Sequence, residues 1–428
     1  MQPVLLLLFL PVLAISAEIT GSWHLTLIGF GEESSHTRVE FKSEGTRITG
    51  IAAPGTFLEM TYEGTLNNDE VRLTATPTRR RRGSIRLEGR IDGDQMNGTG
   101  EQNGEKFTWK ARRLMPAQGP PRTHTFEPVR FHRVFSGAVE PALRIQPGDT
   151  VRTWTVDASG VDANGVRRSL PGNPQTGPFY VEGAMPGDTI AVKFHRIRLN
   201  RNSARSGVWL SPNTVTPLYV RDTKYEDTFN GEWVLDRETG YARLAKPTER
   251  LKNFRVQINP MLGCVAVAPT EKQSFGTSWP GSFGGNMDYN GLREGVTVYL
   301  PVAVPGALLF VGDGHAVQGD GELNGDALET SMDLEFSVNL IQGYATAGPR
   351  MENEEWLMAS GIANSLTEAL QQATTALARW LQRDYRLNAN EAAILLGTSI
   401  HYEIAEVVDP MVHIVAKVKK EVLAKLSE

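Results

Sequence analysis

The sequence predicts a mainly β protein, a β-sandwich or barrel with C-terminal helices, preceded by a small N-terminal antiparallel β-barrel. Three observations lead to this fold class. Residues 18–114 form short segments that alternate apolar and polar side chains, with turn residues about every 8 to 12 positions. Residues 129 to 343 continue the alternation in longer segments. After residue 364 the period changes to that of amphipathic helices.

The first segment, MQPVLLLLFLPVLAISA, is apolar, too short for a comfortable membrane span, and ends in the small residues Ser16 and Ala17. We therefore expect a signal peptide over residues 1–17, a periplasmic or secreted protein, and no stable membrane contact after cleavage. Retention as a membrane anchor is the alternative, because no Lys or Arg precedes the apolar run and Ile15 is bulky for a cleavage site.

Residues 18–114 are expected to form the antiparallel β-domain, with Trp23 and Trp109 in its core. This domain resembles the lipocalin-like accessory modules of some secreted bacterial hydrolases. We expect no catalytic role for His24 or His36, because neither has a second histidine at ligand spacing. The Pro- and Gly-rich residues 115–128 predict a linker, which leaves residues 129–428 as the catalytic domain.

Composition excludes several classes of function. The net charge of −5 provides no basic field for nucleic acid, and the cationic run Arg79–Arg82 is interpreted as a solvated loop. A single cysteine excludes an internal disulfide framework. Because Cys264 lies in the apolar stretch MLGCVAVAP, we expect a buried thiol rather than a nucleophile.

The phrase Pro-Gly-Asp-Thr occurs twice before a predicted strand and predicts turns in which Asp149 and Asp188 act as caps. In the tail, residues 365–385 predict a helix that begins with a capping box. A second helix is expected to end at Gly397, followed by a strand over residues 399–410 and a closing segment that can be helical. His401 and His413 are expected at the surface or a packing edge.

Three glycine-rich loops could carry chemistry: residues 284–288, residues 312–322, and residues 173–178 after a possible ligand at Asp157. A catalytic divalent metal needs about three imidazole or carboxylate ligands and an open position. Asp288, His315 and Glu322 could supply them, and His132 with Asp157 forms a second possible pair. Calcium held by Asp313 and Asp320, or a tight turn without a metal, are the alternatives.

The joined motifs GGNMD and GDGHAVQGDGE, together with NPQTGPFYVEGAMPGDT and NPMLGCVAVAP, resemble the acetamidase/formamidase family from about Thr123 to the C-terminus. The resemblance implies hydrolysis of short amides such as formamide and acetamide, with some relatives acting on cyclic or aryl amides. It also implies a β-rich fold with added helices, zinc or calcium in relatives, and homo-oligomers.

The residues that match the family pattern are Asn286, Asp288, His315, Gln318, Asp320 and Glu322. On this basis we expect Asp288 and His315 to hold a metal, zinc rather than calcium, or to orient water, with Glu322 as general base. Asn286 and the amides of Gly284 and Gly285 are candidate oxyanion donors. The remaining candidates are Gln318 and Asp320 as catalytic residues, His132 and Asp157 as further metal ligands, and Glu329 as a second-tier residue.

The sequence thus favours an exported, metal-assisted amidohydrolase acting on small linear or cyclic amides. Phe283, apolar before the glycine pair, favours a substrate less hydrophilic than formamide. A non-catalytic amide- or calcium-binding protein on the same scaffold is the alternative. A serine amidase is disfavoured because the chain has no Gly-x-Ser-x-Gly motif.

Overall fold

The computed structural model describes residues 18–30, 33–54, 59–79, 83–115, 119–226, 228–270 and 273–426. The expected signal peptide and residues 80–82 of the cationic run lie outside this part. The chain divides into two compact units, residues 1–115 and 116–428. Each unit is described by itself.

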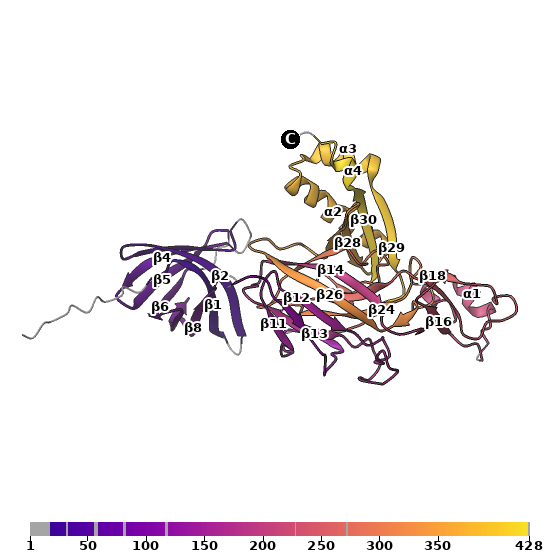
Figure 1. Ribbon diagram of the computed structural model, residues 1–428. Coiled ribbons are helices and arrows are strands. Elements are labelled where there is room, and N and C mark those ends of the chain that lie inside the picture. Colours follow the sequence, from indigo (N-terminus) through magenta and orange to yellow (C-terminus); the bar gives the residue numbers. More distant parts are fainter. Residues whose placement is uncertain are drawn as a thin grey trace, which may run out of the picture. The chain divides into compact units, whose positions relative to one another are not determined.

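The first unit is a closed antiparallel barrel in which each strand pairs with the next and the last pairs with the first (Figure 1). Apolar side chains alternate inward, so Trp23 and Trp109 are buried in the core as predicted. The predicted N-terminal barrel is confirmed. Its strands are β1 (Gly21–Phe30), β2 (Glu33–Glu44), β3 (Arg47–Ala52), β4 (Met60–Asn67), β5 (Glu70–Pro77), β6 (Ile85–Asp92), β7 (Gln95–Gln102) and β8 (Glu105–Arg113).

Pairing of β1 with β2 brings His24 and His36 together, although their sequence spacing did not indicate it. His24 Nε2 lies 2.9 Å from His36 Nδ1, and Thr26 Oγ1 lies 3.2 Å from each of these atoms. Burial, and then the neighbouring charges of His36 and Arg112, lower the pKa of His24 to about 4. The contact is cross-strand, so it depends on the register of two strands rather than on a local motif.

The second unit contains two large sheets in its described residues. One has nine strands, and within it β14 pairs with β23 on one side and with β26 on the other. In spatial order its strands are β29 (His401–Glu406), β30 (Val412–Lys419), β28 (Trp356–Ala363), β27 (Arg350–Glu352), β23 (Thr297–Pro301), β14 (Thr189–Leu199), β26 (Met332–Ile341), β12 (Thr150–Trp154) and β9 (Thr123–Thr125).

The other sheet has eleven strands among the described residues, and β19 and β24 lie adjacent within it. Its main path is β18 (Val256–Gln257), β17 (Tyr241–Leu244), β16 (Glu232–Asp236), β15 (Ser203–Arg205), β25 (Glu329–Thr330), β24 (Leu309–His315), β19 (Met261–Ala266), β22 (Gly284–Asn286) and β21 (Pro280–Gly281). Strand β13 (Thr176–Val181) joins β24 and carries β11 (Leu143–Ile145), while β10 (Val134–Ser136) pairs separately with β20 (Ser274–Gly276).

The Pro-Gly-Asp-Thr turns form as predicted. An Asp149 carboxylate oxygen accepts the backbone N–H of Gln146, and one from Asp188 accepts that of Met185. The thiol of Cys264 is fully buried in β19, and burial raises its pKa well above the usual range. This environment agrees with an inert thiol.

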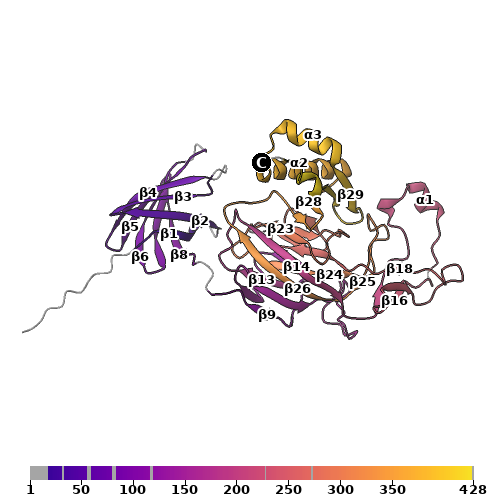
Figure 2. The same ribbon diagram turned by 45° about the horizontal axis from the view of Figure 1, so that its top comes forward.

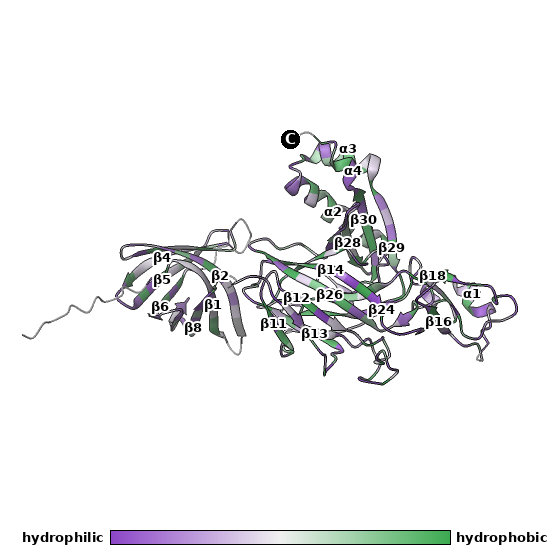
Figure 3. Cartoon of the chain, viewed as in Figure 1, coloured by the Kyte–Doolittle hydropathy of each residue, from purple (hydrophilic) through white to green (hydrophobic). Residues whose placement is uncertain are grey.

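Helix α2 (Leu366–Asp384) covers β28 and β30, whose residues are largely hydrophobic (Figures 2 and 3). Ser365 caps it by accepting the Glu368 N–H. Other helices are the short η1 (Pro212–Thr214) and α1 (Pro217–Asp222), then α3 (Ala389–Ser399) and α4 (Lys420–Leu423). No helix in the described residues is long and apolar enough to cross a membrane. The predicted class, mainly β with C-terminal helices, is confirmed.

Three details of the tail differ from expectation. Helix α3 continues through Gly397 to Ser399, and Gly397 does not have the positive φ of a glycine that ends a helix. The closing segment is mostly strand β30, followed by one helical turn. His413 is fully buried rather than peripheral, and its Nδ1 lies 2.6 Å from the carbonyl oxygen of Met287.

Candidate active site

Strand β19 brings the two glycine motifs together. Cys264 on this strand lies opposite Asn286 of β22 on one side and Gly312 of β24 on the other. Residues separated by about 25 positions in the sequence therefore lie on the two strands that flank β19. Strand β24 and the loops that follow β22 and β24 supply three of the acidic side chains of the site, Asp288, Asp313 and Glu322.

Gly263 of β19 lies beneath two of these carboxylates. A Cβ atom at this position would lie 2.2 Å from Asp288 Oδ1 and 2.5 Å from Asp313 Oδ2, closer than real Cβ contacts allow. Only glycine therefore lets both carboxylates approach the strand.

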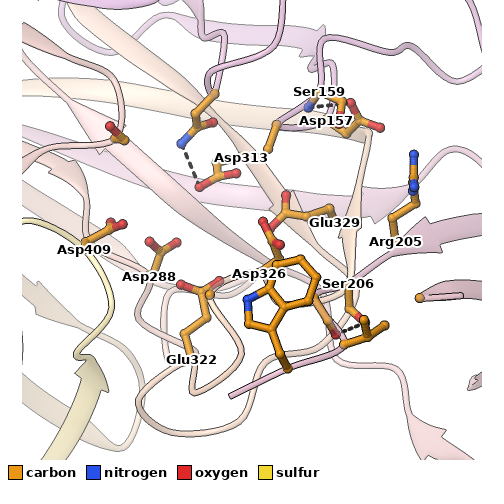
Figure 4. Close-up of a pocket in the computed structure, with 18 of the residues that line it drawn as sticks. Asp157, Ser159, Arg205, Ser206, Asp288, Asp313, Glu322, Asp326, Glu329 and Asp409 are labelled. Atoms are coloured by element: carbon orange, nitrogen blue, oxygen red, sulfur yellow. Dashed lines mark hydrogen bonds between the residues drawn. The ribbon is translucent and has the colours of Figure 1, made fainter. Parts of the chain in front are cut away.

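The carboxylates open into a cavity of about 770 Å³. In Figure 4 the side chains of Asp288, Asp313, Glu322, Glu329 and Asp409 face a common space, and Arg205 lies on the opposite side from Asp288 and Asp409. These five carboxylates come from the loop after β22, from β24, from the loop after β24, from β25 and from the loop between β29 and β30. The site is thus assembled from segments far apart in the sequence.

His315 is buried among these carboxylates. Its Nε2 lies 3.0 Å from Glu329 Oε1, 3.4 Å from Asp313 Oδ1 and 3.8 Å from Asp288 Oδ1. Despite these short distances, Nε2 has no hydrogen-bond partner of acceptable geometry, nor has Asp288 Oδ1. Two sets of three potential metal ligands share this histidine: Asp288, His315 and Glu322, and Asp313, His315 and Glu329.

Gln318 sets the tautomer of His315. Its amide nitrogen donates to the carbonyl oxygens of Asp288 and Ala405, at 2.6 and 3.1 Å. Its amide oxygen must therefore face His315 Nδ1, 2.9 Å away, and can only accept. In the neutral ring the proton is held on Nδ1, which leaves the Nε2 lone pair directed at the carboxylates.

Two asparagines connect the carboxylates. Asn286 Nδ2 donates to Asp288 Oδ2 at 2.5 Å and to Asp409 Oδ2 at 2.6 Å. Asn173 Nδ2 donates to Asn286 Oδ1 at 2.5 Å and to Asp313 Oδ2 at 3.0 Å. Asn286 uses its amide hydrogens on carboxylates, so the structure gives it a positioning role in place of the oxyanion-donor role that we expected.

The cluster contains more acidic than basic side chains. Burial is the largest cause that raises the pKa of Asp288 well above its usual range, and the charges of Glu322 and Asp313 add to it. Burial likewise raises the pKa of Glu329 to about 7 and that of Asp409 to about 6. Burial acts to lower the pKa of His315, but Glu329 and Asp313 outweigh it and raise that pKa. Such a cluster needs bound protons or a cation to compensate its charge.

Four site residues have left-handed backbone, which is uncommon for residues other than glycine. The φ angles are +55° at Asn173, +35° at Asp288, +61° at Asp313 and +49° at Glu322. The local conformation turns each side chain toward the cluster, and the surrounding strands hold it there.

Three predicted residues lie apart from the cluster. Asp320 is exposed and accepts a hydrogen bond from Asn290 Nδ2 at 2.7 Å. His132 pairs through its backbone with Gln175, and its ring packs edge-on against Phe310. Neither Asp320 nor His132 lines the cavity.

Asp157 lines the cavity, but its carboxylate is already engaged. One oxygen lies 2.6 Å from Arg201 Nη2, and the other accepts the backbone N–H groups of Ser159 and Val161. The structure therefore does not join His132 and Asp157 into the second ligand pair that we expected, and neither belongs to a potential metal set in the described residues.

The residues before Asn286 have structural positions. Gly284 and Gly285 have positive φ and pack against the backbone of β19 and of residues 279–280, so neither lines the cavity. Phe283 is buried and stacks on Phe275 with ring centroids 5.1 Å apart. Because Phe283 does not line the cavity, it gives no information on the polarity of the substrate.

Sequence reasoning missed Asp409, and it did not assign a role to Asn173. Asp409 lies in the loop between β29 and β30, which Glu406 shapes by accepting the backbone N–H groups of Val408 and Asp409. An acidic residue before a proline, Asp409-Pro410, was the available signal, but it is weak by itself. The loop of residues 173–178 was singled out, and its contribution is the Asn173 amide.

Known proteins share this fold and sequence. A family model, the acetamidase/formamidase family, matches residues 270–422. The crystal structure of an acetamidase from Yersinia enterocolitica is 30% identical, with 73% of this chain and 96% of that chain covered at a TM-score of 0.60. The chain belongs to the acetamidase/formamidase family. Both motifs, with Asn286 and His315, lie inside the residues that the family model matches. The N-terminal barrel of this family member lies outside them.

Two further relatives have similar coverage. The crystal structure of a predicted acetamidase/formamidase from Thermoanaerobacter tengcongensis is 27% identical to this chain. The match covers 72% of this chain and 98% of the Thermoanaerobacter chain, at a TM-score of 0.60. The acetamidase of Mycolicibacterium smegmatis is 25% identical over an alignment of 348 residues, with 63% of this chain and 86% of that protein covered.

Proposed function

We propose that this protein is an exported amidohydrolase that cleaves the C–N bond of small amides with water, giving a carboxylate and ammonia or an amine. The observation that carries the proposal is the cluster of five carboxylates around His315, four of them buried and Asp409 partly buried, at one end of an open cavity. Asp288, Asp313, His315 and Glu322 lie in the two motifs that carry the family resemblance, and relatives are named acetamidase and formamidase.

The residues fit a divalent metal, which we include in the proposal. His315 Nε2, Asp288 Oδ1 and Glu329 Oε2 are buried atoms without a hydrogen-bond partner, and the carboxylates of the cluster outnumber its one histidine. His315 with Asp313 and Glu329, its two nearest carboxylates, would hold the ion, and Asp288 would complete the set. A histidine ligand favours zinc over calcium, which binds oxygen atoms. When bound, the ion would stabilise negative charge on the amide oxygen.

Glu322 is the proposed general base. Its Oε1 accepts the Ala327 N–H at 2.9 Å, which fixes the carboxylate, and the residue lines the cavity. It takes a proton from water as the water oxygen attacks the amide carbon. It then returns that proton to the nitrogen as the C–N bond breaks, so that the amine leaves neutral.

The cavity has room for amides larger than acetamide. Its lining also includes Arg205, Trp209 and Phe229. Pockets of this size enclose drug-sized molecules. Linear, cyclic and aryl amides therefore all belong in the substrate panel.

The first test measures ammonia release from that panel by the wild type, Glu322→Gln and His315→Ala. Loss of general-base catalysis is expected to lower kcat by about 10²- to 10⁴-fold in Glu322→Gln. Asp320→Asn is the matched control, because Asp320 belongs to the same motif but is exposed, and it should keep wild-type activity. Equal activity in all four proteins contradicts the proposed site. Amide binding without turnover by the wild type favours the non-catalytic binding protein instead.

The metal is tested by elemental analysis of the purified protein and by dialysis against a chelator. We expect about one zinc per chain in the wild type and a lower melting temperature after removal, because the buried carboxylates lose their compensating charge. His315→Ala should lose zinc, and Asp320→Asn should retain it. A metal-free wild type with full activity contradicts this part of the proposal.

Export is tested by fractionating cells that express the full chain. Cleavage after Ser16 or Ala17 and recovery outside the cytoplasm are expected, and an uncleaved chain in the membrane fraction would instead indicate an anchor. A homo-oligomer is also proposed, and light scattering of the purified protein measures its mass.

A further inference from the structure

A second cavity lies at the C-terminal end of helix α2, between the helix and strands β23 and β27 of the nine-stranded sheet. Its volume is about 430 Å³. The lining differs in character from that of the carboxylate cavity, because it combines aromatic rings with two arginines. The residues that define it are Tyr299, Tyr344, Arg350, Trp380, Arg383 and Tyr385.

Arg350 is the unusual member of this lining. It is only 6% exposed, and its guanidinium carbon lies 4.2 Å from the centre of the Trp380 ring and 5.2 Å from that of Tyr344. Its Nε has no hydrogen-bond partner, and no carboxylate in the described residues forms an ion pair with it. Ring contacts compensate part of the cost of burying a cation, but they leave the Nε–H donor unsatisfied.

The acidic residues of the same cavity are already engaged. Glu352 accepts from Tyr299 Oη and from Lys420 Nζ, the latter at 2.5 Å. Asp384 Oδ1 lies 3.5 Å from Arg383 Nε. With both carboxylates paired to other groups, Arg350 contributes one uncompensated positive charge to the cavity.

We propose that this cavity is a binding site for a small aromatic monocarboxylate, held by Arg350. A planar carboxylate matches the fork of N–H donors on a guanidinium, and one negative charge matches the single uncompensated cation. The rings of Tyr344, Trp380 and Tyr385 provide an apolar surface for a flat ligand body. The site is separate from the carboxylate cluster around His315, and the proposal does not depend on the chemistry there.

The experiment titrates the full-length protein with sodium benzoate by calorimetry, at constant ionic strength. Benzamide, which is neutral and has the same shape, is the matched ligand control. We expect saturable binding of one benzoate per chain and none of benzamide. Arg350→Met, which keeps the length and loses the charge, should bind at least tenfold more weakly. Arg379→Gln removes an exposed cation from the same helix outside the cavity and should bind like the wild type.

Three results would overturn the proposal: no saturable binding by the wild type, equal binding of benzamide, or unchanged binding by Arg350→Met. Benzoate could also enter the carboxylate cavity as a product analogue, so Glu322→Gln is titrated in parallel. If Glu322→Gln loses benzoate binding while Arg350→Met retains it, benzoate binds in the carboxylate cavity and the proposal is overturned. If Arg350→Met does not fold, Ile341→Trp is titrated instead, because it fills the cavity and keeps Arg350. Loss of benzoate binding in Ile341→Trp supports the site, and retention of binding contradicts it.

Discussion

Gln318 shows how one side chain can fix the chemistry of another. Its amide nitrogen is held by two backbone carbonyl groups, so its oxygen can only accept from His315 Nδ1. The sequence motif placed Gln318 among the catalytic candidates. The structure instead makes it a positioning residue, because it touches the histidine and does not line the cavity.

Replacing Gln318 by leucine should therefore release the His315 ring without removing a ligand. We expect kcat and zinc affinity to fall together by about 10- to 100-fold, as is typical for partners of ligating histidines. Glu is the informative second variant, since Gln318→Glu can still accept from Nδ1 and should retain more zinc than Gln318→Leu. Equal zinc content and activity in Gln318→Leu and the wild type would contradict the positioning role.

Asp149 gives a pH-dependent prediction away from the site. Its burial acts to raise the pKa, but hydrogen bonds from the Arg122 and Gln146 N–H groups and from His124 outweigh burial and lower it below 3.8. A depressed folded-state pKa stabilises the protein above the unfolded value, and this stability is lost as the pH falls through the folded value. At pH 7, Asp149→Asn should therefore lower the free energy of unfolding by about 2 kcal/mol.

Urea denaturation of both proteins between pH 7 and pH 2.5 checks this prediction. The difference between the wild type and Asp149→Asn should be constant above about pH 5 and should shrink below about pH 4. A difference that does not change with pH would show that the charge of Asp149 is not the cause.

At the scale of elements, strand β19 organises the active site. It pairs with both strands that carry the motifs, and Gly263 leaves space for two carboxylates above it. Gly263→Ala should displace Asp288 and Asp313, and a displacement of about 1 Å can cost 10²-fold in rate.

The control for this substitution is Gly319→Ala. Gly319 belongs to the second motif, but no atom lies within 4 Å of the position of an added Cβ. We expect Gly319→Ala to keep its activity and its zinc, whereas Gly263→Ala loses both while its circular dichroism spectrum is unchanged. Comparable activity in Gly263→Ala and Gly319→Ala would contradict the proposal that Gly263 of β19 leaves the space that Asp288 and Asp313 need.

The elements also show what the sequence could predict. Alternation identified the barrel, and helical periodicity identified α2, because both patterns are local. The motifs indicated Asp288, His315 and Glu322, which lie within short segments. Asp409 could not be found in this way, since it reaches the cluster only through the pairing of β29 with β30 and of β30 with β28. His413 was misplaced for the same reason: its burial depends on the packing of β30 against the residues around Met287.

At the scale of the whole molecule, each of the two units has its own hydrophobic core. All the residues of the proposed site belong to the second unit. A chain that begins at Gly119 should therefore fold and hydrolyse small soluble amides with a kcat comparable to that of the full-length protein. Ammonia release by the two chains measures this, and loss of activity in a folded shorter chain would assign the barrel a direct part in catalysis.

The left-handed backbone at the site has a consequence for evolution in the laboratory. Asn173, Asp288, Asp313 and Glu322 each hold a conformation that disfavours a side chain by about 1 to 2 kcal/mol, and three of them also hold buried acid groups close together. Glycine at any of these positions should relieve strain, and loss of a carboxylate should relieve repulsion as well. A library screened only for heat resistance would therefore accumulate inactive chains with substitutions at these four residues, so selection for robustness must be coupled to turnover.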